Sequence, residues 1–299
     1  MEMGEIIAMP PPHIAEKCPF CPPPKDEDFV SHPGAKASGT TLAQIMVSPE
    51  DLVSKQAGAR PKDGGAERQA KPSAKPKPNP PLSHPTFGPY SYEAHHLIPG
   101  KQDLLKNEGD QKVLDGHPIE KWLCKGPNIK KDTGYSINNS DNGVWLASAP
   151  ESVKKLRGRS PARPWEREDH PSPHPNALTQ AEKNEIADFA MESAGQFHYG
   201  KHAITDEAGS AASYPKVVHT RLTQLNDRIT AWSKECPLCG KKPSNPPYDP
   251  SWKVNEMMDL ISMWIQMEIQ MSGPQSWTYF ISSHAMRRSK AVQKKVKSF

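Results

Sequence analysis

The stretch "SYEAHHLIPG", residues 91–100, places two adjacent histidines between an alanine and an apolar pair, directly before a Pro-Gly turn signal. Neighbouring side chains of a β-strand point to opposite faces of the sheet, so paired imidazoles fit poorly inside a buried strand. Where a strand ends, however, the backbone curls and both rings can face one cleft. The stretch therefore predicts a short strand that finishes at His95 and His96.

The composition limits both the core and the class of partner. Of the 299 residues, 35% are hydrophobic and 33 are prolines, so we expect a compact core with much loop or extended arm. The net charge of +4 permits a polyanionic partner without requiring one. No apolar run reaches the length of a membrane span, and the start "MEMGEIIAMPPPHIAEK" lacks the features of a secretory signal. We expect no membrane contact.

Four segments differ in composition along the chain. Residues 1–53 form an N-terminal arm with the pair "CPFC", and residues 54–85 are rich in Pro, Lys and Ala, as in extended linkers. Residues 86–235 contain apolar clusters that can build a domain. Residues 236–299 contain "CPLCG", a Met-rich segment and a basic tail. The fold class predicted from these segments is α+β and mostly helical, with long Pro-rich loops.

Local patterns predict the elements. "GYSINNSDNGVWLAS", residues 134–148, is typical of strand, turn and strand, because turn-forming residues separate its apolar parts. Thr179 and Glu182 form a capping-box pair at the start of a helix. Further helices are predicted within residues 40–55, from Tyr214 to Trp232 and over the Met-rich residues 257–271.

Polar residues in three blocks form a constellation. After His95 and His96 come Asn142, in a turn before "GVWL", and "FHYGKH", which holds His198 and His202. In this order the blocks resemble the HNH/endonuclease VII nuclease superfamily, in particular its Ala-His-His (AHH) branch. The resemblance covers about residues 90–230 and is carried by "YEAHHLIPG", "DTGYSINNSDNGVWLAS", "GQFHYGKH" and "YPKVVHTRL". It implies a ββα-metal (His-Me finger) core: two strands, a helix and one divalent cation.

The resemblance also implies roles for these residues. His96 is expected to be the general base and His95 a metal ligand, and the reverse order stays open. His198 and His202 would complete the metal site from a helix, with His219 as the alternative to His202. A neutral imidazole accepts a proton from water near neutral pH, and a cation (Mg, Mn, Zn or Ni) stabilises charge at phosphorus. Asn142 would bond the backbone across the finger and so hold the base.

The implied activity is metal-dependent endonucleolytic hydrolysis of DNA, with RNA as a second candidate substrate. No element that reads base edges is apparent, so we expect little sequence specificity and mainly phosphate contacts. Candidates for these contacts are Lys130, Lys131, Arg157, Arg159 and the basic tail. The resemblance further implies an antibacterial toxin. Such toxins are commonly type VI secretion effectors, with a carrier protein and a cognate immunity protein. We expect a bacterial protein, cytoplasmic in its producer and delivered into the cytoplasm of a target cell.

Two Cys-Pro-x-Cys pairs lie at opposite ends of the chain. Together they offer four thiolates for a tetrahedral structural zinc that would join the N- and C-terminal segments: Cys18, Cys21, Cys236 and Cys239. Unrelated turns or redox pairs are the alternative, and Cys124 is expected to be a buried thiol. If the histidines and cysteines were structural ligands alone, the chain would be a non-catalytic zinc-stabilised binding or adaptor module. A nicking assay with and without chelator separates this reading from the nuclease.

Overall fold

The computed structural model describes residues 31–34, 37–49, 74–100, 107–108, 111–112, 117–156, 178–198, 214–235, 245–249 and 252–297. The chain divides into two compact units, each built from three separate segments. Unit 1 takes Met1–Lys75, His96–Gly143 and Val218–Trp264, and unit 2 takes Pro76–His95, Val144–Val217 and Ile265–Phe299. The boundary between the units therefore falls between the two adjacent histidines.

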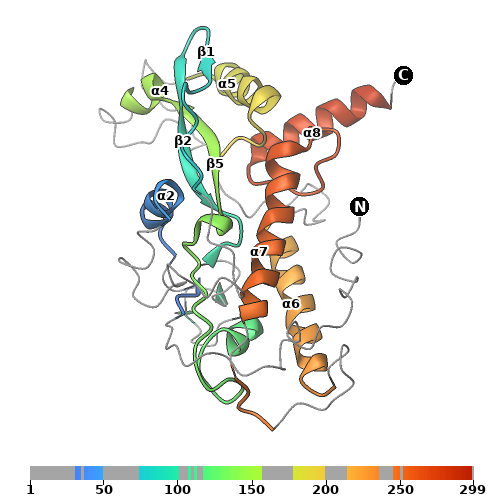
Figure 1. Ribbon diagram of the computed structural model, residues 1–299. Helices are drawn as coiled ribbons and strands as arrows, with labels where there is room; N and C mark the ends of the chain where they lie inside the picture. Colours follow the sequence, from blue (N-terminus) through green and yellow to red (C-terminus); the bar gives the residue numbers. More distant parts are fainter. Residues whose placement is uncertain are drawn as a thin grey trace. The chain divides into compact units, whose positions relative to one another are not determined.

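A three-stranded sheet in the order β1-β2-β5 carries unit 2 (Figure 1). The strands are β1 Ser83–His84, β2 Gly88–His96 and β5 Gly143–Pro150. β1 and β2 are antiparallel, and Gly88 enters β2 with φ 75°, a conformation that favours glycine. β2 ends at His96, so the strand end predicted from "AHH" is confirmed.

The helices of unit 2 complete its core. They are α4 Glu151–Leu156, α5 Gln180–Ser193 and α8 Ser283–Val296, with a π-helical turn η7 at Met267–Met271. α5 opens with the predicted capping box between Thr179 and Glu182. Its buried face packs on the sheet, where the Tyr90 hydroxyl donates to the Ile186 carbonyl at 2.6 Å. Burial of these apolar side chains is the main stabilising term of the unit.

Unit 1 contains α2 Gly39–Val47, the 3₁₀ turns η4 Pro118–Trp122 and η5 Ser140–Asn142, and most of two longer helices. These are α6 Tyr214–Trp232 and α7 Trp252–Gln266, which lie side by side in Figure 1. The Arg221 guanidinium lies 4.8 Å from the centre of the Trp264 ring across this helix pair. A small hairpin joins β3 Asn107–Glu108 and β4 Gln111–Lys112. The helices predicted from Tyr214 and over the Met-rich segment are confirmed.

One local prediction is wrong. Residues 134–148 were expected to form two strands, but only the second, β5, is present. Before η5 a single bridge joins Ser136 to His32, because nearby Asn and Ser side chains bond the local backbone in place of a ladder. The range predicted as a linker, residues 54–85, contains ordered contacts near its end. The Lys75 amide donates to the Met46 carbonyl, and β1 lies within the segment.

None of the helices in the described ranges is both long enough and apolar enough to span a bilayer. The linear division into arm, linker, nuclease domain and tail stays a prediction.

Candidate active site

The end of β2 brings His95 against His198 within unit 2. The two ring centres are 4.9 Å apart at an interplanar angle of 66°, and His95 is 5% exposed. β5 positions the second ring, because the His198 amide donates to the Ala147 carbonyl at 2.8 Å. The Tyr214 ring, 5.4 Å from that of His95, covers the pair. Two imidazoles far apart in the sequence therefore share one site.

Glu93 is a member of this cluster that sequence reasoning missed. It lies two residues before His95 on the same strand, so both side chains leave the same face of β2. Its Oε2 lies 3.2 Å from His198 Nδ1, an ion-pair contact without the alignment of a linear hydrogen bond. Its Oε1 accepts a hydrogen bond from the Ser148 hydroxyl at 3.1 Å. Carboxylates in this position orient metal-binding histidines. The i, i+2 spacing of Glu93 and His95 was the signal in the sequence.

His96 has different partners, all in unit 1. Its Nε2 is 2.9 Å from Asn138 Oδ1, which also accepts a hydrogen bond from the Ser38 amide at 2.9 Å. Since this oxygen is an acceptor, His96 Nε2 carries the proton in the neutral ring, and Nδ1 is the accepting nitrogen. Burial lowers the pKa of His96, and the bond to Asn138 opposes this shift. Asn138 was also missed, because its contact to His96 depends on the fold.

Asn142 is fully buried at the end of η5 and joins this turn to the end of β2. Its Oδ1 accepts from the Ile98 amide at 2.7 Å and from the Ser262 hydroxyl at 2.9 Å. Its Nδ2 donates to the carbonyls of Ile98, at 3.2 Å, and Ile137, at 2.8 Å. The side chain therefore uses its full hydrogen-bonding capacity, and it fixes the backbone two residues after His96.

The neighbouring Gly143 is required by close packing. A Cβ there would lie 2.6 Å from Met46 Sδ, a separation that real contacts do not allow. The carbonyl of Gly143 accepts a hydrogen bond from Lys75 Nζ at 2.8 Å. Burial lowers the pKa of Lys75, and Asp141 and Asp259 oppose this shift. Asn-Gly is thus more than a hairpin turn pair here.

Other predicted site residues lie elsewhere or outside the described part. The expectation that His198 lies on a helix is wrong, because α5 ends at Ser193 and His198 follows in extended chain. His219, the alternative ligand, lies on α6 in unit 1 with its ring 4.7 Å from that of His117. Lys130 forms an ion pair with Asp249 at 3.1 Å. Residues that lie outside the described ranges are His202, Arg157, Arg159, Cys18, Cys21, Cys236 and Cys239.

Cys124 is a half-buried free thiol, and burial raises its pKa to about 12. A buried thiol was predicted, and the side chain is half-buried, with the raised pKa of an unreactive thiol. The zinc knuckle stays a prediction.

The donor set fits a divalent cation in part. In the ranges that the structure describes, no group of three or more His, Cys, Asp and Glu side chains converges as a metal site. His95 and His198 supply two imidazoles, the donors that Zn and Ni accept readily. Glu93 contacts the Nδ1 of His198 and so acts on this residue as its partner. Further ligands would come from water or from residues outside the described part, such as His202.

Comparison with known proteins agrees with this geometry. Residues 81–207 match the AHH family, described as a nuclease family of the HNH/ENDO VII superfamily with conserved AHH. The matched range contains β1, β2, β5 and α5, with Ala94, His95 and His96 as its AHH motif. No curated protein and no solved structure matches the chain. The resemblance read from the sequence is confirmed.

Proposed function

We propose that this chain, whose residues 81–207 match the AHH nuclease family, is a divalent-cation-dependent endonuclease that cuts DNA with little sequence specificity. The family match supports hydrolysis of nucleic acid. The finer proposal rests on the different contacts of the two adjacent histidines at the end of β2. His95 contacts His198, whereas His96 is bonded to Asn138. Adjacent imidazoles with separate partners suit separate roles, one as ligand and one as base.

His96 is the proposed general base. Asn138 Oδ1 accepts a hydrogen bond from the protonated Nε2 of His96. Nδ1 is therefore the nitrogen that can accept a proton from water. Its lowered pKa keeps the ring neutral at neutral pH, as a base that takes a proton from water requires. Asn142 supports this orientation through its bonds to Ile98. This assignment keeps the order expected from the resemblance.

His95 and His198 are the proposed ligands, with His202 as the ligand expected from outside the described residues. When bound, the cation supplies Lewis-acid stabilisation of the charge that develops at phosphorus and on the leaving oxygen. Glu93 holds the His198 ring through Nδ1 and leaves Nε2 for the ligand role.

The proposed biological role rests on the resemblance alone. We infer a bacterial toxin effector that enters a target-cell cytoplasm through a secretion system, with a carrier and an immunity protein as partners. DNA is the proposed substrate and RNA the second candidate. Growth arrest with loss of chromosomal DNA on cytoplasmic expression, absent from the His96→Ala variant, is the expected result.

Plasmid nicking with and without chelator tests the activity. We expect chelation to stop nicking and Mg²⁺ or Mn²⁺ to restore it. His219→Ala tests the alternative ligand: this exposed residue on α6 packs against His117, and nicking at the parent rate would exclude it from the cation site. Pure, cation-loaded protein that does not nick under any cation would contradict the proposal and favour the non-catalytic adaptor.

A further inference from the structure

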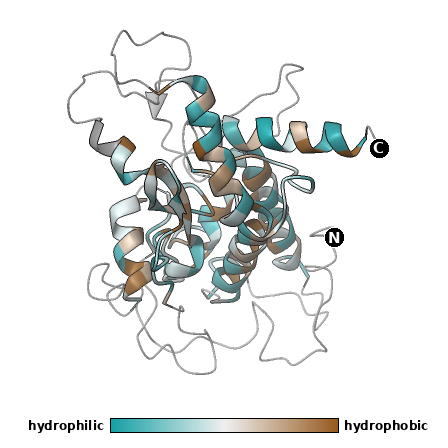
Figure 2. Cartoon of the chain, turned by 90° about the horizontal axis from the view of Figure 1, so that it is seen from above, coloured by the Kyte–Doolittle hydropathy of each residue, from teal (hydrophilic) through white to brown (hydrophobic). Residues whose placement is uncertain are grey.

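We propose that the solvent-facing side of α8 is a binding surface for the phosphate backbone of nucleic acid, an inference that rests on the proposed nuclease function. α8, "SHAMRRSKAVQKKV", contains five Lys and Arg residues and no Asp or Glu. It lies outside the range that matches the nuclease family. In Figure 2 the helix that ends near the C mark is mainly hydrophilic. A helix with cations and no carboxylate attracts polyanions.

Three of the five cations of α8 lie on one side of the helix, together with Lys297 of its C-cap. Arg287, Lys290, Lys294 and Lys297, named here the basic row, are all exposed. At 3.6 residues per turn their spacing places them within an arc of about 80° and along about 15 Å of the helix axis. The opposite side holds Ala285 and Ser289, which are buried. Packing therefore leaves the basic row to solvent.

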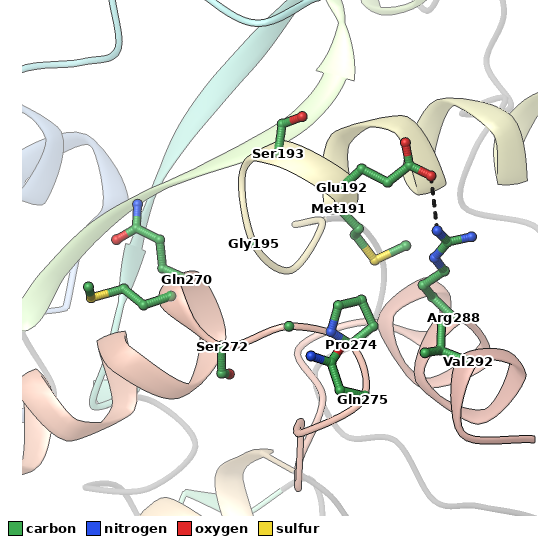
Figure 3. A pocket seen from close by; sticks show the side chains of 12 residues that line it. Met191, Glu192, Ser193, Gly195, Gln270, Ser272, Pro274, Gln275, Arg288 and Val292 are labelled. Carbon is green, nitrogen blue, oxygen red and sulfur yellow. Dashed lines mark hydrogen bonds and ion pairs between the residues drawn. The ribbon is translucent and has the colours of Figure 1, made fainter. Parts of the chain in front are cut away.

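Arg288 forms ion pairs that link α8 to α5, and it is not part of the basic row. It lies 2.9 Å from a Glu192 oxygen and 3.6 Å from an Asp188 oxygen, both on α5. Figure 3 shows the contact to Glu192 at the edge of a cavity of about 460 Å³ that Gln275 and Val292 also line. Because two carboxylates offset the Arg288 charge, the cavity does not suit an anion. The anion-binding side of α8 is the exposed one.

The start of α8 is bonded to the segment that carries His198. Ser282, the N-cap residue, donates through its hydroxyl to the Phe197 carbonyl at 2.7 Å. The Ile281 amide donates to Gln196 Oε1 at 2.9 Å. Both acceptors directly precede His198, and all of these residues belong to unit 2. A substrate that lies along α8 is therefore held in a fixed relation to this proposed ligand.

Duplex DNA fits this surface better than the other common polyanions. It carries one negative charge per roughly 1.7 Å of axis, so a row of about 15 Å meets several phosphates at once. Helices that bind membranes set large apolar side chains against their basic face. The side of α8 behind the basic row holds Ala285 and Ser289, which are buried where the helix packs against α5, and its single large exposed apolar side chain is Val296, too little for a membrane-binding face. We therefore commit to nucleic acid as the occupant.

The test is the salt dependence of duplex binding in two triple variants, both in the His96→Ala background to prevent cleavage. The test variant is Lys290→Gln, Lys294→Gln and Lys297→Gln. The control removes the same charge from exposed lysines elsewhere: Lys77→Gln, Lys125→Gln and Lys234→Gln. Fluorescence anisotropy gives the dissociation constant of a short duplex at each salt concentration.

The slope of log K against log salt is negative, and each lost phosphate contact reduces its magnitude by about 0.9. We expect the magnitude of the slope to be smaller by about 2.7 in the test variant and unchanged in the control. Lys→Arg at the same three positions should keep the slope, because charge is retained. Equal slopes in test and control would overturn the proposal.

Two further arms separate the other outcomes. If the parent protein nicks plasmid and the test variant keeps its slope, the surface proposal fails and the proposed function stands. If the parent neither nicks nor binds duplex, the proposed function fails as well. Vesicles rich in phosphatidylserine test the membrane alternative. A test variant that loses vesicle binding but keeps its DNA slope would overturn the assignment to nucleic acid.

Discussion

At the scale of single residues, the environment of each histidine in the AHH motif indicates what its substitution should do. His96 is half-buried and bonded to Asn138, with a lowered pKa. His96→Ala is expected to reduce the cleavage rate about 10²–10⁴-fold, because the proton acceptor is lost while phosphate contacts remain. Single-turnover nicking measures the rate, and anisotropy checks duplex binding. A rate within a few-fold of the parent would transfer the role of base to His95.

Substitution of Glu93 tests the cation site separately, because its carboxylate contacts the proposed ligand His198. Glu93→Gln keeps the shape and the acceptor for Ser148 but removes the charge beside His198 Nδ1. The affinity for the cation is expected to fall about 10–100-fold, with activity returning at high cation concentration. Calorimetry with Mn²⁺ and cation titrations of nicking measure both effects. His198→Ala should behave in the same direction with a larger loss.

The matched control for this experiment is Glu151→Gln on α4. Glu151 accepts a hydrogen bond from the Ser91 hydroxyl on β2 at 2.7 Å, so it resembles Glu93 in its contact to the sheet. No such role towards His198 is assigned to it. If both substitutions changed cation affinity equally, the orientation of His198 by Glu93 would be excluded as the cause.

The lowered pKa of His117 predicts that the stability of the protein depends on pH. Burial first, and then the charge of His219, lower its pKa to about 4, while Asp227 opposes the shift. In the unfolded chain the pKa returns to about 6.5, so the unfolded state binds the proton first. This contribution to stability is complete above about pH 6.5 and is lost as the pH falls towards 4.

His117→Asn isolates the effect. Its Oδ1 can keep the bond that His117 Nδ1 accepts from the Ile119 amide, so the cap of η4 is retained. The free energy of unfolding of the variant is expected to vary less between pH 6.5 and pH 4 than that of the parent. Urea titrations at several pH values measure it. Parallel curves would show that another group titrates in this range.

At the scale of elements, Asn142 is the junction between β2, η5 and α7. In Asn142→Asp the new oxygen would face the carbonyls of Ile98 and Ile137, to which Nδ2 now donates. Each buried polar group left unsatisfied costs about 1–3 kcal/mol, so we expect a loss of about 2–6 kcal/mol of unfolding free energy. Urea denaturation measures the loss. Asn184→Asp on α5 is the control, because its oxygen keeps the bond that it accepts from Gln180.

Elements with local signals were predictable from the sequence, and those with distant partners were not. The capping box at Thr179 and the periodic apolar residues of α6 are properties of a few neighbouring residues, and both predictions are confirmed. Residues 134–139 look like a strand, but their partners are long-range: Ser136 bridges His32, and Asn138 accepts from Ser38. No local pattern contains such contacts.

The candidate site divides in the same way. The histidine pair at a strand end could be read from one stretch, because the turn signal follows directly. Glu93 and Asn138 become partners of His198 and His96 only when distant segments meet. The helical spacing of His198 and His202 was misleading, since α5 ends at Ser193. Hydrogen bonds and ring contacts between distant segments therefore decide which of the predicted residues are brought together.

At the scale of the whole molecule, the chain passes repeatedly between its two units. Each unit takes one segment from the first third of the chain, one from the middle and one from the last third, which begins at Val218 in unit 1 and at Ile265 in unit 2. The composition changes at the Pro-rich stretches, but it does not change where the chain crosses from one unit to the other. The sequence therefore predicted domains in linear order. Interleaving has a consequence for which pieces of the chain can fold.

Truncation after Glu235 separates the two descriptions. The linear order makes residues 236–299 a tail that the nuclease domain does not require. In the structure this segment supplies α7 to unit 1, where Ser262 bonds Asn142, and α8 to unit 2, where Ser282 bonds Phe197.

The truncated chain loses the apolar side chains that α7 and α8 bury, among them Met258, Ile261 and Ala285. Fully burying one large apolar side chain contributes about 1.5–3 kcal/mol, and a whole domain is stable by about 5–15 kcal/mol. We therefore expect the truncated protein to lack a cooperative thermal transition and to be digested rapidly by protease. Circular dichroism and limited proteolysis measure both. The control removes only the last two residues, Ser298 and Phe299, and should melt like the parent. A truncated protein that unfolds cooperatively would show that the nuclease segment folds without its C-terminal helices, and the linear order would then be right.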